Sequence, residues 1–403
     1  MNQISQIYSH NKFFHFHDQF KLKLNKVLFD NFNLAYNDLH ENNKLKIDEI
    51  NNIKNKLLLN LDLIFKDFNG QIKDDYEYKE YLHEYLNELL KLVAISIENN
   101  IKIYTFKNKN KFDQKKVEEF QIFNNDKYII KNLSFKTQKK ITAICDKKIK
   151  YFKNLSSNKV CSRKEMTLDS GFEIKRIIYL LNKNFNFNGT NKLVSQYMNC
   201  EYEVTGCALE FSPSNANWWQ GYGSADIKTK YIHLDNSSIN PKAICYLSDV
   251  NLENGPTSFF PRVYENLEIN HLQDLVGRNV PIISSSKNLN KLKKIIGNGF
   301  NFFDNIIIRK LFMCLPEEFF FNSHIGWDIP ADSFLEKKLL NSEKTFTGNA
   351  GSYVLFDGAK LFHRGGMVKS GHRIALQIVF GKKVNIHKKF ITLIINAIKK
   401  IYN

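Results

Sequence analysis

The sequence predicts an α+β protein in which helices from the N-terminal half flank a β-barrel or β-sandwich. Two features of its 403 residues lead to this prediction. Residues 20–100 place apolar side chains at helical spacing, whereas after about residue 200 short β-favouring runs follow one another between Gly, Pro, Asn and Asp. Strands at this density are typical of a barrel or sandwich, and an apolar content of 43% is enough for a sizeable core.

The helical prediction rests on the spacing of Ile, Leu and Tyr. Residues 47–68 repeat Ile and Leu at intervals of three and four, and Asn69-Gly70 is an end signal. Residues 76–97 place Tyr and Leu side chains on one face. We expect these helices to pack within the protein, with a partner-binding helix pair as the alternative. The Lys-rich residues 101–165 are expected to mix short helices and loops.

We expect the chain to consist of three parts. Residues 1–165 form a mainly helical region, residues 166–385 form the β domain, and residues 386–403 form a basic amphipathic helix. A long insertion at about 264–348 interrupts the β domain. The expected strands are 201–211, 230–235, 243–250, 257–261, 352–357 and 373–380.

The net charge of +17 first raises the question of a nucleic-acid partner. Only 7 of the 58 basic residues are Arg, and Lys, Asn, Ile and Phe are abundant together, as an AT-rich coding sequence would produce. We therefore do not expect a nucleic-acid partner, while the basic helix at 386–403 leaves contact with an anionic membrane surface open.

The cysteines and the lack of targeting or membrane-spanning segments predict where the protein is located. The six cysteines contain no CxxC pair, and the sequence has neither the apolar core of a signal peptide nor a run of about 18 apolar residues. The expectation is a soluble cytoplasmic protein, and its oligomeric state is left open.

His233 and Asp235 form the first candidate site. In the expected strand 230–235 they are two residues apart and point to the same face, so an imidazole and a carboxylate converge. His363 follows far downstream in GSYVLFDGAKLFHRGG. Two His and one carboxylate form the facial triad that binds Fe(II) and leaves its opposite face open, as O2 chemistry requires.

Arg373, ten residues after His363, is the second candidate. A guanidinium makes two parallel charge-assisted bonds to a carboxylate and does not deprotonate, so it suits the far carboxylate of a dicarboxylic co-substrate. Because Arg is rare in this chain, its presence at this position is informative.

These segments resemble the phytanoyl-CoA dioxygenase-like family of Fe(II)/2-oxoglutarate-dependent oxygenases. The resemblance implies a double-stranded β-helix, which is a jelly-roll, cupin-like barrel. It also implies Fe(II) on His233, Asp235 and His363, 2-oxoglutarate on Arg373, and O2 as oxidant. The implied reaction hydroxylates a C–H bond of a small molecule and releases succinate and CO2. The matching segments are HLD at 233–235, AICYLSDVNLENGPTSFFP at 243–261, and GSYVLFDGAKLFHRGG with GHRIALQIVF within 351–380.

The details of the resemblance limit its reach. Related halogenases replace the carboxylate ligand by a small residue, so Asp235 argues for hydroxylation. Pro261 is followed by Arg262, where the family often has Gly-Ser-His, and Gly365 stands where the family often has Ser or Thr. These departures concern the substrate and the secondary co-substrate contacts.

Further residues are weaker candidates. Thr257 and Tyr231 are expected to contact the co-substrate, with packing inside the barrel as the alternative for each. His324 is expected in a solvated loop, with a place bordering the site as the alternative. Arg364 is expected to face away from the site, and His372 is expected on the opposite strand face from Arg373. Trp218, Trp219 and Gln220 could form a wall of the substrate pocket, with a plain structural role as the alternative. For the pair His15 and His17 no metal role is expected.

Two other classes of function fit the sequence. The barrel could be catalytically inactive, with its basic helical half binding nucleic acid or anionic lipid. It could also be a cupin-like metalloenzyme that needs no 2-oxoglutarate, which succinate release would distinguish.

Overall fold

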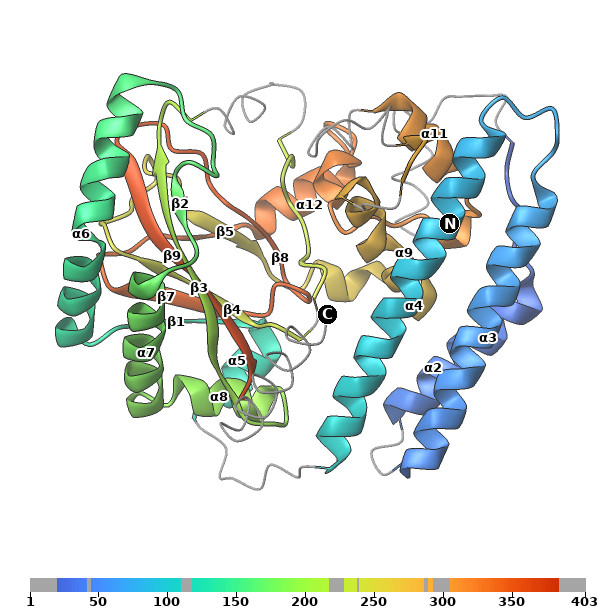
Figure 1. Cartoon of the computed structure of the whole chain (residues 1–403), viewed down its shortest axis with the longest axis horizontal. Helices are drawn as coiled ribbons and strands as arrows, with labels where there is room; N and C mark the ends of the chain where they lie inside the picture. The colour runs from blue at the N-terminus through green and yellow to red at the C-terminus, as the bar shows by residue number, and fades with distance from the viewer. Residues whose placement is uncertain are drawn as a thin grey trace, which may run out of the picture.

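Two antiparallel sheets and two groups of helices make up the computed structural model of the chain (Figure 1). The structure describes residues 20–41, 45–109, 118–216, 228–237, 239–285, 289–292 and 305–383. Within them, helices accompany an antiparallel β structure, which confirms the expected α+β class.

The larger sheet has six strands in the order β1-β7-β4-β9-β3-β2, and the smaller sheet has three in the order β6-β5-β8. Neighbouring strands in both sheets pair antiparallel. The strands of the larger sheet are β1 (Tyr128–Asn132), β2 (Thr167–Leu168), β3 (Tyr202–Pro213), β4 (Lys242–Tyr246), β7 (Ser352–Phe356) and β9 (His372–Lys382). Those of the smaller sheet are β5 (Thr257–Phe260), β6 (Lys344–Phe346) and β8 (Phe362–Arg364).

The two faces of β9 contribute to two different hydrophobic cores. Ile374, Leu376 and Ile378 belong to a core shared with the helices that cover the outer face of the sheet. Ala375, one position out of phase, belongs to a core between the sheets. Because successive strand residues alternate in direction, Arg373 shares the inner face with Ala375. The helices on the outer side are α5 (Phe120–Asp126), α6 (Phe135–Asn158), α7 (Phe172–Phe187) and α8 (Thr190–Tyr197).

The N-terminal helices pack on the insertion, and the two form one continuous core. In Figure 1 the insertion lies between the N-terminal helices and the sheets. The helices are α2 (Lys26–Glu41), α3 (Ile47–Gln71) and α4 (Lys79–Lys109). The insertion runs from the end of β5 to the start of β6 and contains η3 (Tyr264–Leu267), α9 (His271–Asn279), η4 (Val280–Ser285), α11 (Ile306–Met313), η6 (Glu317–Phe319), η7 (Ile325–Trp327) and α12 (Phe334–Ser342).

The first part of the β structure begins earlier than the expected boundary at residue 165. β1 lies at the edge of the larger sheet, where Tyr128 pairs with Phe356 and Asn132 pairs with Ser352. The stretch expected to mix short helices and loops also contains α6, a helix of 24 residues that begins where the Ser134 side chain accepts from the Thr137 N–H. The boundary therefore does not separate helices from strands.

The expected strand at 230–235 is wrong in extent, because the described residues there make only one isolated β-bridge, between His233 and His363. The predicted basic helix at 386–403 lies outside the described residues, so it stays a prediction. None of the described helices is long and apolar enough to span a bilayer.

Candidate metal centre and anion-binding site

The segment that carries His233 and Asp235 is extended, although it is too short to count as a strand. Ile232 and Leu234 are buried in the core shared by the N-terminal helices and the insertion, which leaves His233 and Asp235 on the other side. The His233 N–H donates to the His363 carbonyl at 3.0 Å, and the His363 N–H donates back to the His233 carbonyl at 3.0 Å. This reciprocal pair brings two histidines together that are distant in sequence.

The insertion holds this segment from the opposite side. The Leu234 N–H donates to the Ser323 carbonyl at 2.8 Å, and the Gly326 N–H donates to the Ile232 carbonyl at 3.1 Å. A side chain on Gly326 would lie 2.1 Å from the Thr229 carbonyl oxygen, so this close approach requires glycine. The insertion is therefore part of the scaffold of the site.

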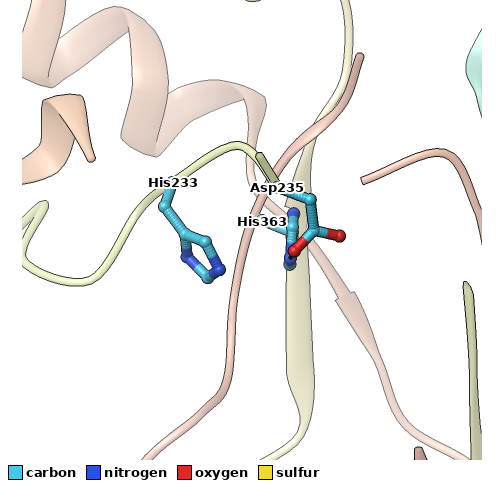
Figure 2. Close-up of side chains that lie close together, drawn as sticks. All are labelled: His233, Asp235 and His363. Atoms are coloured by element: carbon cyan, nitrogen blue, oxygen red, sulfur yellow. Dashed lines mark ion pairs between the residues drawn. The ribbon is translucent and has the colours of Figure 1, made fainter. Parts of the chain in front are cut away.

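Three side chains converge at this place. Figure 2 shows the imidazoles of His233 and His363 and the carboxylate of Asp235 pointing toward one another. One donor atom from each of them lies within 4.8 Å of the others, and Nε2 of His363 lies 3.9 Å from Oδ1 of Asp235. The predicted triad is thus brought together by the fold.

Hydrogen bonds leave one nitrogen of each imidazole for a metal. Nδ1 of His233 lies 2.9 Å from the Tyr231 carbonyl oxygen, and Nδ1 of His363 lies 3.0 Å from that of Leu361. A carbonyl oxygen only accepts, so these contacts assign the proton to Nδ1 and the lone pair to Nε2. Metal-binding histidines are commonly oriented by such a bond.

The charges of the triad suit a divalent cation. Burial lowers the pKa of His233, and burial together with the neighbouring His233 lowers the pKa of His363 to about 3, so both imidazoles are neutral at neutral pH. Burial opposes ionisation of Asp235, but His363 and Lys242 outweigh it and bring the pKa of Asp235 to about 2. Two neutral nitrogens and one carboxylate are therefore available to the metal.

Lys242 and Gly358 are neighbours of the triad that sequence reasoning missed. The Lys242 ammonium donates to Oδ1 of Asp235 at 2.6 Å. The Asp235 N–H donates to the Gly358 carbonyl at 2.7 Å, and a side chain on Gly358 would lie 2.0 Å from Oδ2 of Asp235. Within the described residues, that buried Oδ2 has no hydrogen-bond partner. An orphaned carboxylate oxygen in a cradle that only glycine leaves open fits a metal ligand.

Arg278 of α9 ties the two ligand-bearing segments together. Its Nη1 donates to the Asp235 carbonyl at 2.8 Å, and its Nη2 donates to the Ala359 carbonyl at 2.8 Å. Its Nε donates to Asp274 at 2.8 Å, and the side chain is 9% exposed. The rarity of Arg in the sequence was the only signal that could have marked this residue.

His324 corrects a prediction. It is half-buried, and its ring stacks on His233 with centroids 5.0 Å apart, so it does not lie in a solvated loop. Burial, followed by the neighbouring His233 and His363, lowers the pKa of His324 to about 3. The physical reason is that the Ser323 carbonyl pairs with Leu234, which draws the adjacent His324 to the site.

Tyr231 also departs from expectation. Its backbone is left-handed, with φ of 70°, so it does not continue the alternation of the following residues and does not share a strand face with His233. Its ring packs edge-on against Trp327 at 5.4 Å. Tyr231 contributes its carbonyl oxygen to His233.

Arg373 lies between the sheets and is 8% exposed. Its Nη1 donates to the Gly255 carbonyl, and its Nη2 lies 3.4 Å from the Ser212 hydroxyl and 3.6 Å from Oε1 of Glu210. Its buried Nε has no partner within the described residues. A guanidinium with an unused buried donor is equipped to bind an anion.

The remaining predicted residues fall into three groups. Thr257 is buried at the start of β5 and lies on the same strand face as Phe259, which belongs to the core between the two sheets. Its contact with a co-substrate stays a prediction. Arg364 pairs with Glu343, with nitrogen–oxygen distances from 2.8 to 3.2 Å, and His372 stacks on Phe211 of the outer core, so both face as expected. Outside the described residues lie Trp218, Trp219, Gln220, His15 and His17.

The donor set of this centre fits Fe(II). Two neutral imidazoles and a carboxylate on one side of an ion leave positions open for other ligands, and nitrogen–oxygen sites of this type are characteristic of non-haem iron. The ring centroids of His363 and Phe356 lie 5.0 Å apart. Phe356 and Ala375 belong to the core between the two sheets, and Ala375 lies two residues after Arg373 on the same strand face. The metal centre and Arg373 therefore face the same interior.

No protein-family model and no curated protein matches this chain. Similar solved structures include AviO1 from Streptomyces viridochromogenes Tue57, with 11% identity, a TM-score of 0.33, and coverage of 66% of this chain and 94% of that one. EctD from S. alaskensis, solved with 2-oxoglutarate and 5-hydroxyectoine, has 10% identity, a TM-score of 0.38, and coverage of 66% and 76%. HygX from Streptomyces hygroscopicus, solved with nickel and 2-oxoglutarate, has 10% identity, a TM-score of 0.32, and coverage of 67% and 88%. At these identities and TM-scores the similarities do not establish a family, so the assignment of function rests on the residues of the site.

Proposed function

We propose that this chain is an Fe(II)/2-oxoglutarate-dependent dioxygenase that hydroxylates a C–H bond of a small organic molecule. The single observation that carries the proposal is the meeting of His233, Asp235 and His363 within 4.8 Å, with Nδ1 of both imidazoles on carbonyl oxygens. The proposal includes the phytanoyl-CoA dioxygenase-like family and a double-stranded β-helix formed by the two sheets.

Each part of the site has a role in this proposal. The triad holds Fe(II) through two Nε2 atoms and the Asp235 carboxylate, and Arg373 binds the far carboxylate of 2-oxoglutarate. Bound Fe(II) supplies the redox chemistry that couples decarboxylation of 2-oxoglutarate by O2 to substrate hydroxylation, with succinate and CO2 as co-products. His363 is buried and His233 and Asp235 are half-buried, which limits access of water to the reacting groups.

The first test is anaerobic titration of the protein with Fe(II) and then with 2-oxoglutarate, followed calorimetrically. We expect metal binding by the wild type and by Arg373→Ala, loss of metal binding in His233→Ala, and strong loss of 2-oxoglutarate binding in Arg373→Ala. Unchanged co-substrate affinity in Arg373→Ala would remove this residue from the site.

The second test exposes the loaded protein to O2 and a panel of metabolites, with succinate as the readout. Succinate release that depends on Fe(II) and is absent in Asp235→Ala supports the oxygenase. Metal-dependent turnover without succinate would favour the cupin-like enzyme. Absence of metal binding, combined with steeply salt-dependent binding of nucleic acid or anionic lipid, would favour the inactive barrel.

A further inference from the structure

A buried carboxylate lies beside the arginine that is proposed to bind the co-substrate. Glu210 of β3 is directly opposite Ala375 of β9, so its side chain lies on the inner face between the diagonal neighbours Arg373 and Gln377. Its side chain is 6% exposed. A negative charge at this place opposes the binding of a second carboxylate to Arg373, so its presence needs a physical account.

The contacts of Glu210 divide between its two oxygens. Oε2 accepts from Nε of Arg163 at 3.1 Å, from Nη2 of Arg163 at 2.8 Å and from Nε2 of Gln377 at 2.7 Å. Oε1 accepts from the Ser212 hydroxyl at 3.3 Å and lies 3.6 Å from Nη2 of Arg373. Arg163 is therefore the closer and better-aligned cation, and Arg373 is only loosely engaged.

The charges explain why two arginines are present. The charges of Glu210 and Arg373 alone sum to zero, so this pair would attract an anion only weakly. Together with Arg163, the three side chains carry a net charge of +1. Burial raises the pKa of Glu210, but Arg163 and then Arg373 outweigh this effect and lower the pKa, so the carboxylate stays ionised. A carboxylate entering beside Arg373 meets a net positive site.

Arg163 comes from outside the strands and is held in place. It lies in the turn between α6 and β2, and the Thr167 hydroxyl donates to its carbonyl at 2.8 Å. The same turn is joined to β3 by the Phe211 N–H, which donates to the Met166 carbonyl at 3.0 Å. About half of the Arg163 side chain is exposed, with 51% accessible, while its guanidinium reaches the buried Glu210.

We propose that Arg163 is a positioning residue for 2-oxoglutarate, which acts by neutralising Glu210 and so keeps the guanidinium of Arg373 available to the far carboxylate of the co-substrate. This inference rests on the proposed function, because it takes 2-oxoglutarate as the ligand of Arg373. It assigns to the first helical half of the chain a part in co-substrate affinity.

The test is a double-mutant cycle on the Mn(II)-loaded protein, with 2-oxoglutarate binding measured by calorimetry. Arg163→Gln should weaken 2-oxoglutarate about tenfold, as expected for loss of one compensating charge in a partly screened site. Glu210→Gln should bind at least as tightly as the wild type. The double variant should recover the wild-type affinity within about twofold, because both charges are gone. Arg176→Gln, which removes the same charge from an exposed position of α7, is the matched control and should change nothing.

A second ligand separates charge from general damage. 2-Oxopentanoate has the same keto-acid end and chain length but lacks the far carboxylate, so Arg163→Gln should leave its binding unchanged. Affinity for Mn(II) alone should also be the same in all four variants. If Arg163→Gln folds poorly, the single variant Glu210→Gln still decides, because weaker binding by it contradicts the charge argument.

The outcomes are distinguishable from failure of the proposed function. A wild type that binds Mn(II) but no 2-oxoglutarate would remove the proposed function and this inference together. A wild type that binds 2-oxoglutarate, with Arg163→Gln unchanged or with the double variant as weak as Arg163→Gln, would overturn the inference alone.

Discussion

The candidate metal centre (the metal end) and the candidate anion site around Arg373 (the anion end) face the same interior, yet they are held by different kinds of scaffold. Glu210 of β3 lies diagonal to Arg373 and Gln377 of β9, and the two strands pair over most of their length. His233 and Asp235 lie on a segment with a single bridge to β8, and residues of the insertion form two further backbone hydrogen bonds with it. The anion end follows from regular sheet geometry, whereas the metal end depends on irregular backbone and on contacts with the insertion.

The largest expected effect comes from closing the space beside the metal ligand. Gly358→Ala would place a methyl group 2.0 Å from Oδ2 of Asp235 and 3.1 Å from Cε1 of His363. The atom that must shift is the ligand itself, so we expect the affinity for Mn(II) to fall about 100-fold while the protein stays folded. Calorimetric titration and thermal unfolding measure the two quantities.

Gly365→Ala is the control for this prediction. It lies in the same late segment, and a side chain there meets no atom of the described structure within 4 Å. Metal affinity should be unchanged in Gly365→Ala. Equal affinities for Gly358→Ala and the wild type would show that the cradle around Asp235 is not needed.

Arg278→Gln tests the dependence of the metal end on the insertion. It removes the bonds to the Asp235 and Ala359 carbonyls and leaves Asp274 without its arginine. We expect stability to fall by about 3 kcal/mol, because buried groups lose their partner. Metal affinity should fall about tenfold as the two ligand-bearing segments separate.

Urea unfolding and Mn(II) titration check the two effects. Arg262→Gln, whose side chain is 73% exposed, is the control. Reduced stability with full metal affinity would restrict Arg278 to supporting the insertion.

The third prediction concerns pH and the metal-free protein. Burial lowers the pKa values of His324 and His363 from 6.5 to about 3, so between these values the unfolded chain binds more protons than the folded one. Above pH 6.5 both rings are neutral in the folded and in the unfolded chain, so their burial does not reduce the stability through protonation. The free energy of unfolding then falls as the pH is lowered from 6.5 toward 3. His324→Asn should have a shallower decline in urea midpoint over this range than the wild type. Parallel curves for the two proteins would contradict the assignment of a neutral, buried His324.

The smallest expected effect is at the start of α9. The Asn270 side chain accepts from the Gln273 N–H at 2.8 Å, and the side-chain oxygen of Gln273 accepts from the Asn270 N–H at 3.3 Å. Asn270→Ala should cost about 1 kcal/mol of stability in urea unfolding, since it removes a helix cap. Metal affinity should change less than about threefold, because Arg278 lies at the other end of the helix. A loss as large as that of Arg278→Gln would mean that the whole helix must be rigid for metal to bind.

The same contrast explains what the sequence could predict. The convergence of His233 and Asp235 and the opposite directions of His372 and Arg373 follow from local strand rules, so residue order predicted them. His363 was added from the pattern of a facial triad, and the roles of the triad and of Arg373 came from the resemblance to a family. The strand around His233 was wrong because a left-handed Tyr231 and carbonyl partners in the insertion define that segment. Neither feature has a signature in the neighbouring residues.

The supporting residues were missed for a related reason. Lys242, Arg278 and Gly358 act on Asp235 through contacts formed only after distant segments meet, and an isolated Lys, Arg or Gly has many roles. The N-terminal helices were predicted from their periodicity, but the pattern does not say which surface they cover. Rarity was the one usable sign, since both Arg163 and Arg278 belong to a set of 7 arginines.

The core shared by the N-terminal helices and the insertion has a consequence for how the polypeptide can be divided. α2, α3 and α4 bury side chains among residues of α9 and α11, and the same core includes Ile232 and Leu234 beside the metal ligands. A break in the backbone between α4 and α5 would therefore yield two fragments that stay associated through that apolar contact. Expressed without the first fragment, the second would expose an apolar surface next to the candidate metal centre, so the three N-terminal helices are an integral part of the fold and not a removable domain.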